Sequence, residues 1–195
     1  MKNNAFESKN FFKTACLFES SLLIISFFLG WLTGVDPFAS LFFSEKALIT
    51  GIFASLPLLI IYFALQQVSY APLKKISSLL HETLGAALFH RHWTDLLVLA
   101  LIAGFTEEVL FRGFLQPWLE NVFNIGAGLL ISNLIFALVH AVTPLYALLA
   151  LMIGLYLGAF LDVDGQRNLL TPIVIHSLYD FVVFIAIMHN YRKNL

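Results

Sequence analysis

Six of the ionisable side chains that lie within strongly apolar segments of the sequence could act together, since charge there is costly unless it is paired or used. They are Glu107, Glu108, Arg112, His140, His176 and Asp180. A carboxylate in apolar surroundings can act as a general base on water, and a neutral imidazole beside it can orient that water. A second imidazole with a carboxyl group can stabilise the oxyanion that forms on an attacked carbonyl. This set is sufficient to hydrolyse an amide bond without a serine or cysteine nucleophile.

Of the two adjacent glutamates, only Glu108 lies on the same helix face as Arg112. Glu108 and Arg112 are four residues apart and can neutralise each other. Glu107 is rotated by about 100° from Glu108 and by about 140° from Arg112, at 3.6 residues per turn. Because an unpaired charge at the bilayer centre costs roughly 2.5–3.5 kcal/mol on insertion scales, Glu107 needs a separate partner. We predict a structural ion pair for Glu108 and Arg112 and a functional role for Glu107.

Partners for Glu107 are expected on two later apolar segments. In the last of these, His176 and Asp180 are four residues apart and face the same way. Polar groups in lipid converge on one another or on a wet cavity, so we expect these faces to meet around Glu107. In the earlier segment, one helix face carries Asn133, Phe136, Ala137 and His140.

A site of this kind requires His140 and His176 to lie at the same depth in the membrane. In straight, untilted helices His140 and His176 would be roughly 20 Å apart along the membrane normal, at 1.5 Å per residue across a core of about 30 Å. Catalysis requires both rings around one water, at a hydrogen-bonding distance of about 3 Å. The site therefore requires short, tilted helices around a sunken cavity.

The elements that must position these residues are membrane helices. The chain has 195 residues, of which 59% are hydrophobic and 12% charged, and its mean hydropathy is +0.86. A soluble domain has about a quarter of its residues charged, so the composition predicts an integral membrane protein. We expect an all-α, polytopic bundle of about six transmembrane helices that forms a single membrane domain over residues 1–195. The net charge of −1 excludes a nucleic-acid binder that works through bulk positive charge.

Six apolar segments qualify as spans. Thr143-Pro144 and Thr171-Pro172 each predict a helix start, with threonine as the N-cap and proline at the first helical position. We expect the first segment to be a retained helix rather than a signal peptide, because no small-residue cleavage site follows it. The predicted spans cover residues 15–32, 47–70, 96–116, two parts of 121–161 divided at Thr143, and about 171–188.

Basic residues set the predicted orientation. Eight of them lie at the termini and in loops on one side of the membrane, and two lie on the other side. The positive-inside rule places both termini in the cytoplasm, in a multi-pass protein of the cell membrane. The eight are Lys2, Lys9, Lys13, Lys74, Lys75, Arg91, Arg192 and Lys193, and the two are Lys46 and Arg167.

The loop after the second predicted span has an amphipathic pattern. Apolar residues recur there at three- and four-residue spacing, with Lys74 and Lys75 between them. This stripe predicts a helix lying in the cytoplasmic interface, with its lysines facing anionic headgroups. A short cytoplasmic helix packed on protein is the alternative. The apolar positions are Leu73, Ile76, Leu80, Leu84 and Leu88.

Three motifs, in order and spacing, resemble the CAAX protease and bacteriocin-processing family of intramembrane proteases. The resemblance covers a catalytic core of about residues 96–188. It implies a glutamate-type endopeptidase, formerly classed as a metalloprotease, that hydrolyses a peptide bond of a membrane-associated protein or peptide. The motifs are E-E-x-x-x-R at Glu107, Glu108 and Arg112, F-x-x-x-H at Phe136 and His140, and H-x-x-x-N/D at His176 and Asp180.

The resemblance also implies a role for each residue. Glu107 would be the base that activates water, and His140 would share that water. His176 and Asp180 would form the oxyanion site, and the ion pair on the first motif would hold the helix. No cofactor is implied.

Three alternatives to this function remain open. Glu107, His140 and His176 could form a zinc site, which we disfavour because the H-E-x-x-H helix of such sites is absent. A non-catalytic peptide-binding or bacteriocin-immunity membrane protein would use the same cavity without hydrolysis. A small transporter or proton relay would also carry Glu, His and Asp in the membrane, but no inverted repeat supports it. The expected partners are the lipid bilayer and a membrane-associated protein or peptide.

Overall fold

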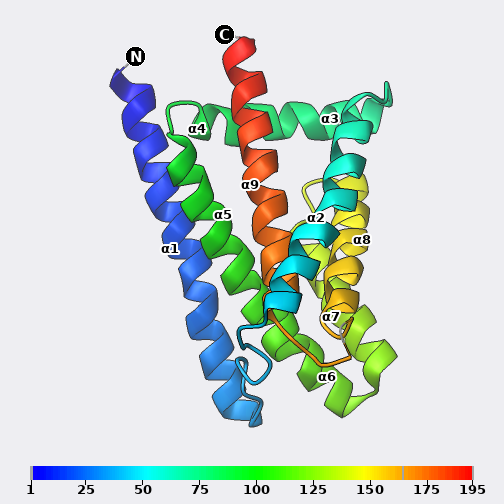
Figure 1. The fold of residues 1–195 in the computed structure, drawn as a ribbon. Helices are drawn as coiled ribbons and strands as arrows, with labels where there is room; N and C mark the ends of the chain where they lie inside the picture. The colour runs from blue at the N-terminus through cyan, green and yellow to red at the C-terminus, as the bar shows by residue number, and fades with distance from the viewer. Residues whose placement is uncertain (1, 164, 195) are drawn as a thin grey trace.

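The computed structural model describes residues 2–163 and 165–194, and within these ranges all regular secondary structure is helical (Figure 1). This confirms the predicted all-α class. Two π-helices in the described ranges, η1 (His81–Gly85) and η2 (Val109–Leu115), join α3 to α4 and α5 to α6. The α-helices are α1 Lys2–Thr33, α2 Glu45–Gln66, α3 Ala71–Leu80, α4 Ala86–Leu88, α5 Trp93–Glu108, α6 Gln116–Val122, α7 Ile125–Val139, α8 Pro144–Phe160 and α9 Leu170–Lys193.

The helices have the length and composition of a membrane bundle. Among the described residues, three helices are long and apolar enough to cross a membrane: Asn10–Thr33, Glu45–Gln66 and Leu170–Lys193. The apolar helices α7 and α8 have 15 and 17 residues, or about 22 and 26 Å at 1.5 Å per residue, which is less than a bilayer core of about 30 Å. The predicted span over 96–116 is helical and carries its charges where α5 meets η2. The chain is therefore a membrane protein built as a helix bundle.

The apolar segment over residues 121–161 divides between α7 and α8 at Thr143, as the sequence predicts. Thr143 Oγ1 accepts a hydrogen bond from the Tyr146 N–H at 3.1 Å, and Pro144 is the first residue of α8. The start of α7 is capped in the same way, because Asn124 Oδ1 accepts from the Ala127 N–H at 2.9 Å. These side chains satisfy N–H groups that have no partner within the helix.

The predicted start of the last span is wrong by two residues. The N-cap of α9 is Leu169, and Thr171 lies inside the helix. Asn168 replaces the expected threonine, because its Oδ1 accepts from the Leu170 N–H at 2.9 Å and its carbonyl accepts from the Thr171 N–H at 3.3 Å. Helices α1 and α9 also extend into polar residues beyond the predicted spans, since hydropathy marks only the apolar part of a longer helix.

Helix α9 runs through the bundle between α5 and α2 (Figure 1). Helix α1 packs along α5, whereas α7 packs against both α6 and α8. The segment α3–η1–α4 lies across the end of the bundle at which both termini lie, as expected of an interfacial helix. Ile76 and Leu88 of this segment are buried, and Lys74 and Lys75 are exposed. Its location at a cytoplasmic membrane surface stays a prediction.

The outward faces of α1 and α2 are apolar and the interior is packed in small clusters. Five large side chains on these faces are between 64 and 78% exposed, which suits contact with lipid rather than water: Phe18, Ile24, Trp31, Phe53 and Ile60. In the interior, one buried cluster joins α2, α8 and α9 and consists of Ala54, Leu58, Leu157 and Ile175. The site lies beside this cluster.

Candidate active site

The predicted ion pair is present at the junction of α5 and η2. Arg112 Nη1 donates a hydrogen bond to Glu108 Oε1 at 2.9 Å, and both side chains are fully enclosed. Arg112 lies within the π-helix η2, which directly follows Glu108. Short π-helical turns inside α-helices are rare and are frequent at functional sites.

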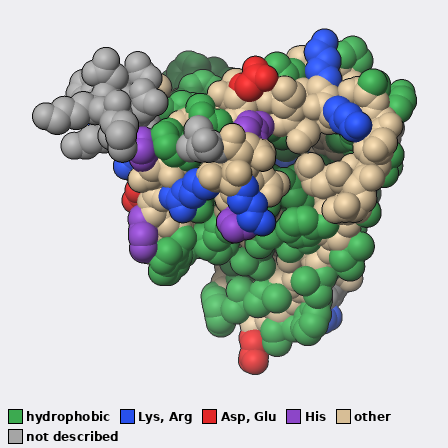
Figure 2. All heavy atoms as spheres, turned by 90° about the horizontal axis from the view of Figure 1, so that it is seen from above, with side chains coloured by type: hydrophobic (Ala, Val, Ile, Leu, Met, Phe, Trp, Pro, Cys, Tyr) green, Lys and Arg blue, Asp and Glu red, His purple; other side chains and the backbone are tan. Residues whose placement is uncertain are grey.

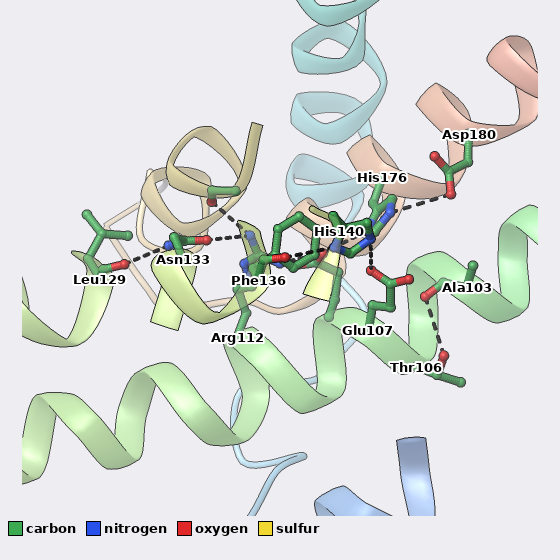
Figure 3. A network of polar contacts seen from close by, with 12 residues as sticks. Ala103, Thr106, Glu107, Arg112, Leu129, Asn133, Phe136, His140, His176 and Asp180 are labelled. Atoms are coloured by element: carbon green, nitrogen blue, oxygen red, sulfur yellow. Dashed lines mark hydrogen bonds and ion pairs between the residues drawn. The ribbon is translucent and has the colours of Figure 1, made fainter. Parts of the chain in front are cut away.

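Arg112 also connects this junction to the neighbouring helices. Its Nη2 donates to Asn133 Oδ1 of α7 and to the Gly154 carbonyl of α8, each at 2.8 Å. Its guanidinium carbon lies 4.7 Å from the centroid of the Phe136 ring, a cation–π distance. One buried guanidinium therefore joins η2, α7 and α8 (Figure 3).

Glu107 points toward the second motif rather than toward Arg112. Its Oε2 lies 3.6 Å from His140 Nε2 and has no hydrogen-bond partner among the described residues. His140 follows the last residue of α7, and its Nδ1 lies 2.8 Å from the Phe136 carbonyl oxygen. Because a carbonyl oxygen only accepts, Nδ1 carries the proton and Nε2 faces Glu107 as the acceptor nitrogen.

His176 lies between two carboxylates. Its Nδ1 is 2.8 Å from Glu108 Oε1. Its Nε2 faces Asp180 (Figure 3), at 3.5 Å from Oδ2. Glu108 Oε1 therefore accepts from both Arg112 and His176. The sequence predicts only the first of these contacts, since nothing in the spacing links residue 108 to residue 176.

The two histidines converge on one site. The ring of Phe136 lies 4.3 Å from the His140 ring and 6.3 Å from the His176 ring, centroid to centroid. The separation of roughly 20 Å in straight spans of full length does not occur, because α7 is short and ends at Val139. All four residues predicted as catalytic line one cavity of about 600 Å³: Glu107, His140, His176 and Asp180.

The cavity is lined mainly by apolar side chains, and it includes polar groups to which the sequence assigns no role. Glu19 of α1 lines it, and its Oε2 is shielded and has no hydrogen-bond partner in the part of the chain that the structure describes. Tyr62, Tyr146 and Tyr179 also line it, from α2, α8 and α9. An acidic residue inside an apolar span is the signal that marks Glu107, and the same signal marks Glu19.

The disfavoured zinc site would use Glu107, His140 and His176 as its ligands. His140 Nδ1 lies against a backbone carbonyl, which leaves its Nε2 with a free lone pair, whereas both nitrogens of His176 face carboxylate oxygens. Across residues 2–163 and 165–194, no group of three or more His, Cys, Asp or Glu side chains is placed to hold a metal ion. A zinc ion requires three or four converging donors with free lone pairs, and a reaction without zinc stays a prediction.

Comparison with known proteins supports the family suggested by the three motifs. Residues 87–182, about half of the chain, match the Rce1-like family model, which is described as type II CAAX prenyl endopeptidase Rce1-like. The matched segment contains all three motifs. No curated protein and no solved structure matches the chain. The chain belongs to the CAAX protease and bacteriocin-processing family, a family of membrane endopeptidases.

Proposed function

We propose that this protein is an intramembrane endopeptidase of the glutamate type, which cleaves a peptide bond of a membrane-associated protein or peptide. The observation that carries the proposal is the position of Glu107. Its carboxylate lines an apolar cavity, faces the acceptor nitrogen of His140 and keeps one oxygen without a hydrogen bond among the described groups. A carboxylate in such a place can accept a proton from water.

Hydrolysis would begin with a water held between Glu107 and His140. Glu107 takes one proton of this water while the water oxygen attacks the carbonyl carbon of the substrate. The C–N bond of the resulting tetrahedral intermediate then breaks as Glu107 returns the proton to the leaving nitrogen. The products are a new carboxyl terminus and a new amino terminus, and Glu107 is regenerated as a carboxylate.

We infer that His176 stabilises the oxyanion of that intermediate. Its Nε2 lies 3.5 Å from Asp180, longer than an ordinary hydrogen bond, so in the imidazolium form of His176 the Nε2 N–H could donate to a developing oxyanion. The opposite nitrogen is held at 2.8 Å by Glu108, which is fixed in turn by Arg112. In this proposal Glu108 and Arg112 are positioning residues and do not touch the substrate.

We propose that the reaction needs no metal or other cofactor. In this proposal Glu107 and His140 supply the base, and His176 with Asp180 supplies the oxyanion site. The reaction therefore does not require a metal ion to polarise the carbonyl group.

The lining of the cavity, in which apolar side chains from α2, α8 and α9 predominate, suits an apolar peptide segment. The basic residues favour a cytoplasmic position for both termini, and labelling of single cysteines at the two ends of the chain in sealed membranes tests this orientation.

The proposal is tested by incubating the purified full chain, in lipid vesicles, with a set of membrane-anchored peptides. We expect mass spectrometry to find two products that differ from the substrate by one water. The same peptides bound but left intact by the wild-type protein would identify a peptide-binding protein and contradict the proposal.

A further inference from the structure

A second, polar hollow lies at the end of the bundle that carries both chain termini. It has a volume of about 320 Å³, at the lower end of the range for ligand pockets. It is formed where α3 and η1 cross the C-terminal end of α9, and no acidic side chain lines it. Its lining residues are Ser77, Ser78, His81, Asn190, Lys193 and Asn194.

The groups around this hollow suit a phosphate. Lys193 has no ion pair or hydrogen bond within the described residues, and its neighbours Asn190 and Asn194 carry amide donors. His81 keeps its Nε2 without a partner among the described groups. Ser78 is less available, because its hydroxyl donates to Glu82 Oε1 at 2.8 Å at the edge of the hollow. One cation with several neutral donors is a suitable set for a monoanionic phosphodiester.

The location of the hollow favours a lipid as the source of that phosphate. Figure 2 looks onto this end of the molecule and shows basic and histidine side chains spread over it. Helix α9 is long and apolar enough to cross a membrane, and the hollow lies at its C-terminal end, beside the amphipathic α3. Lipid headgroups are concentrated at such a boundary, and each basic residue there gains from anionic lipid. We propose that this hollow binds the phosphate of an anionic phospholipid headgroup.

The hollow and the catalytic cavity share a wall. Ser77 lines both, and Leu73, Ile76 and Leu80 of the same helix line the cavity. The segment is held against α9 by the His81 and Tyr191 rings, whose centroids are 4.7 Å apart, and by Gly85, where a Cβ would lie 2.7 Å from Tyr191 Cδ2. A bound headgroup would therefore fix the wall of the cavity in place.

The test measures lipid binding by the full chain in neutral detergent, using native mass spectrometry. The probes are dioleoyl phosphatidylglycerol, dioleoylglycerol as a lipid without phosphate, and inorganic phosphate as a competitor. The variants are Lys193→Gln and Asn190→Ala, both at exposed positions. Lys75→Gln is the matched control, since it removes the same charge from an exposed site on α3 that does not line the hollow.

We expect phosphatidylglycerol to bind the wild-type protein and dioleoylglycerol not to bind. Lys193→Gln should weaken phosphatidylglycerol binding at least about fivefold, the effect of one lysine at an anionic surface, and Asn190→Ala should also weaken it. Lys75→Gln should change it less than twofold. Equal losses in Lys75→Gln and Lys193→Gln would show diffuse attraction instead of a site. Binding of inorganic phosphate without the lipid would assign the hollow to a free anion, and either result would overturn the proposal.

Discussion

His176 Nδ1 lies 2.8 Å from Glu108 Oε1, the same carboxylate oxygen that accepts a hydrogen bond from Arg112 Nη1 at 2.9 Å. This contact joins the ion pair, which the spacing predicts as structural, to a ring of the proposed oxyanion site. The orientation of that ring therefore depends on a charge pair that is itself fully buried. Changes at Arg112 should consequently affect both the stability of the fold and the chemistry.

Arg112→Met should lower the free energy of unfolding in detergent by about 3–5 kcal/mol, because it leaves Glu108 as a buried charge without its cation. It also removes the hydrogen bonds to Asn133 and Gly154. The control is Arg91→Met, which breaks a partly exposed i,i+4 pair with Asp95 and a cation–π contact with Phe12, and should cost about 1–2 kcal/mol. Denaturant titration measures both. Equal losses in the two variants would contradict the central role of Arg112.

Gly104→Ala should destabilise the protein by about 1–3 kcal/mol, because α5 and α9 pack too closely there for a methyl group. A Cβ at this position would lie 2.8 Å from the Ser177 N and would also clash with Ser177 Oγ. Since Ser177 follows His176, the rate of hydrolysis should fall as well.

The matched control for that variant is Gly126→Ala in α7. A Cβ there would meet only Asn124 Oδ1, at 3.5 Å, and alanine is favoured over glycine in a helix. Thermal unfolding should show no loss for Gly126→Ala. A stable and fully active Gly104→Ala protein would mean that α5 and α9 are further apart than the structure has them.

Glu19→Leu should raise the free energy of unfolding by about 1–3 kcal/mol, because it removes a shielded carboxyl oxygen that has no hydrogen bond among the described residues. The contrasting variant is Glu120→Leu. Glu120 accepts from Arg167 at 2.7 Å and from Gln116 at 2.9 Å, so its removal should destabilise the fold. If Glu19→Leu also destabilises the protein, Glu19 forms a contact that the fold requires.

A chelator should leave proteolysis unchanged, because both ring nitrogens of His176 face carboxylate oxygens and no group of three or more metal-ligating side chains lies together among the described residues. The measurement is the initial rate of peptide cleavage before and after dialysis against EDTA, with zinc added back. A rate that falls on dialysis and returns with zinc would assign the reaction to a metal and reverse this prediction.

Most of the helices could be predicted from the sequence, because apolar runs mark the segments and Thr143-Pro144 marks a break. The Glu108–Arg112 pair also follows from spacing, since residues four apart meet on any helix. The start of α9 could not be predicted in this way, because Asn168 caps it from outside the apolar run.

The assembly of the site depends on features that local patterns do not contain. The end of α7 at Val139 brings His140 to His176, and the π-helix η2 changes the winding around Arg112. The approach of Glu19 to the cavity and of His176 to Glu108 depends on which helices are neighbours. These contacts join residues far apart in the chain, so periodicity carries no information about them.

In the proposed reaction, Glu107 activates the water that cleaves the peptide bond. The most direct test compares kcat/KM for one cleaved membrane peptide between the wild-type protein and Glu107→Gln, which keeps the size of the side chain but removes the base. Glu82→Gln, at an exposed position in η1, is the control. We expect kcat/KM to fall about 10²–10⁴-fold in Glu107→Gln, with unchanged unfolding and peptide binding, and not to fall in the control. Cleavage by Glu107→Gln at the wild-type rate would contradict the proposed reaction.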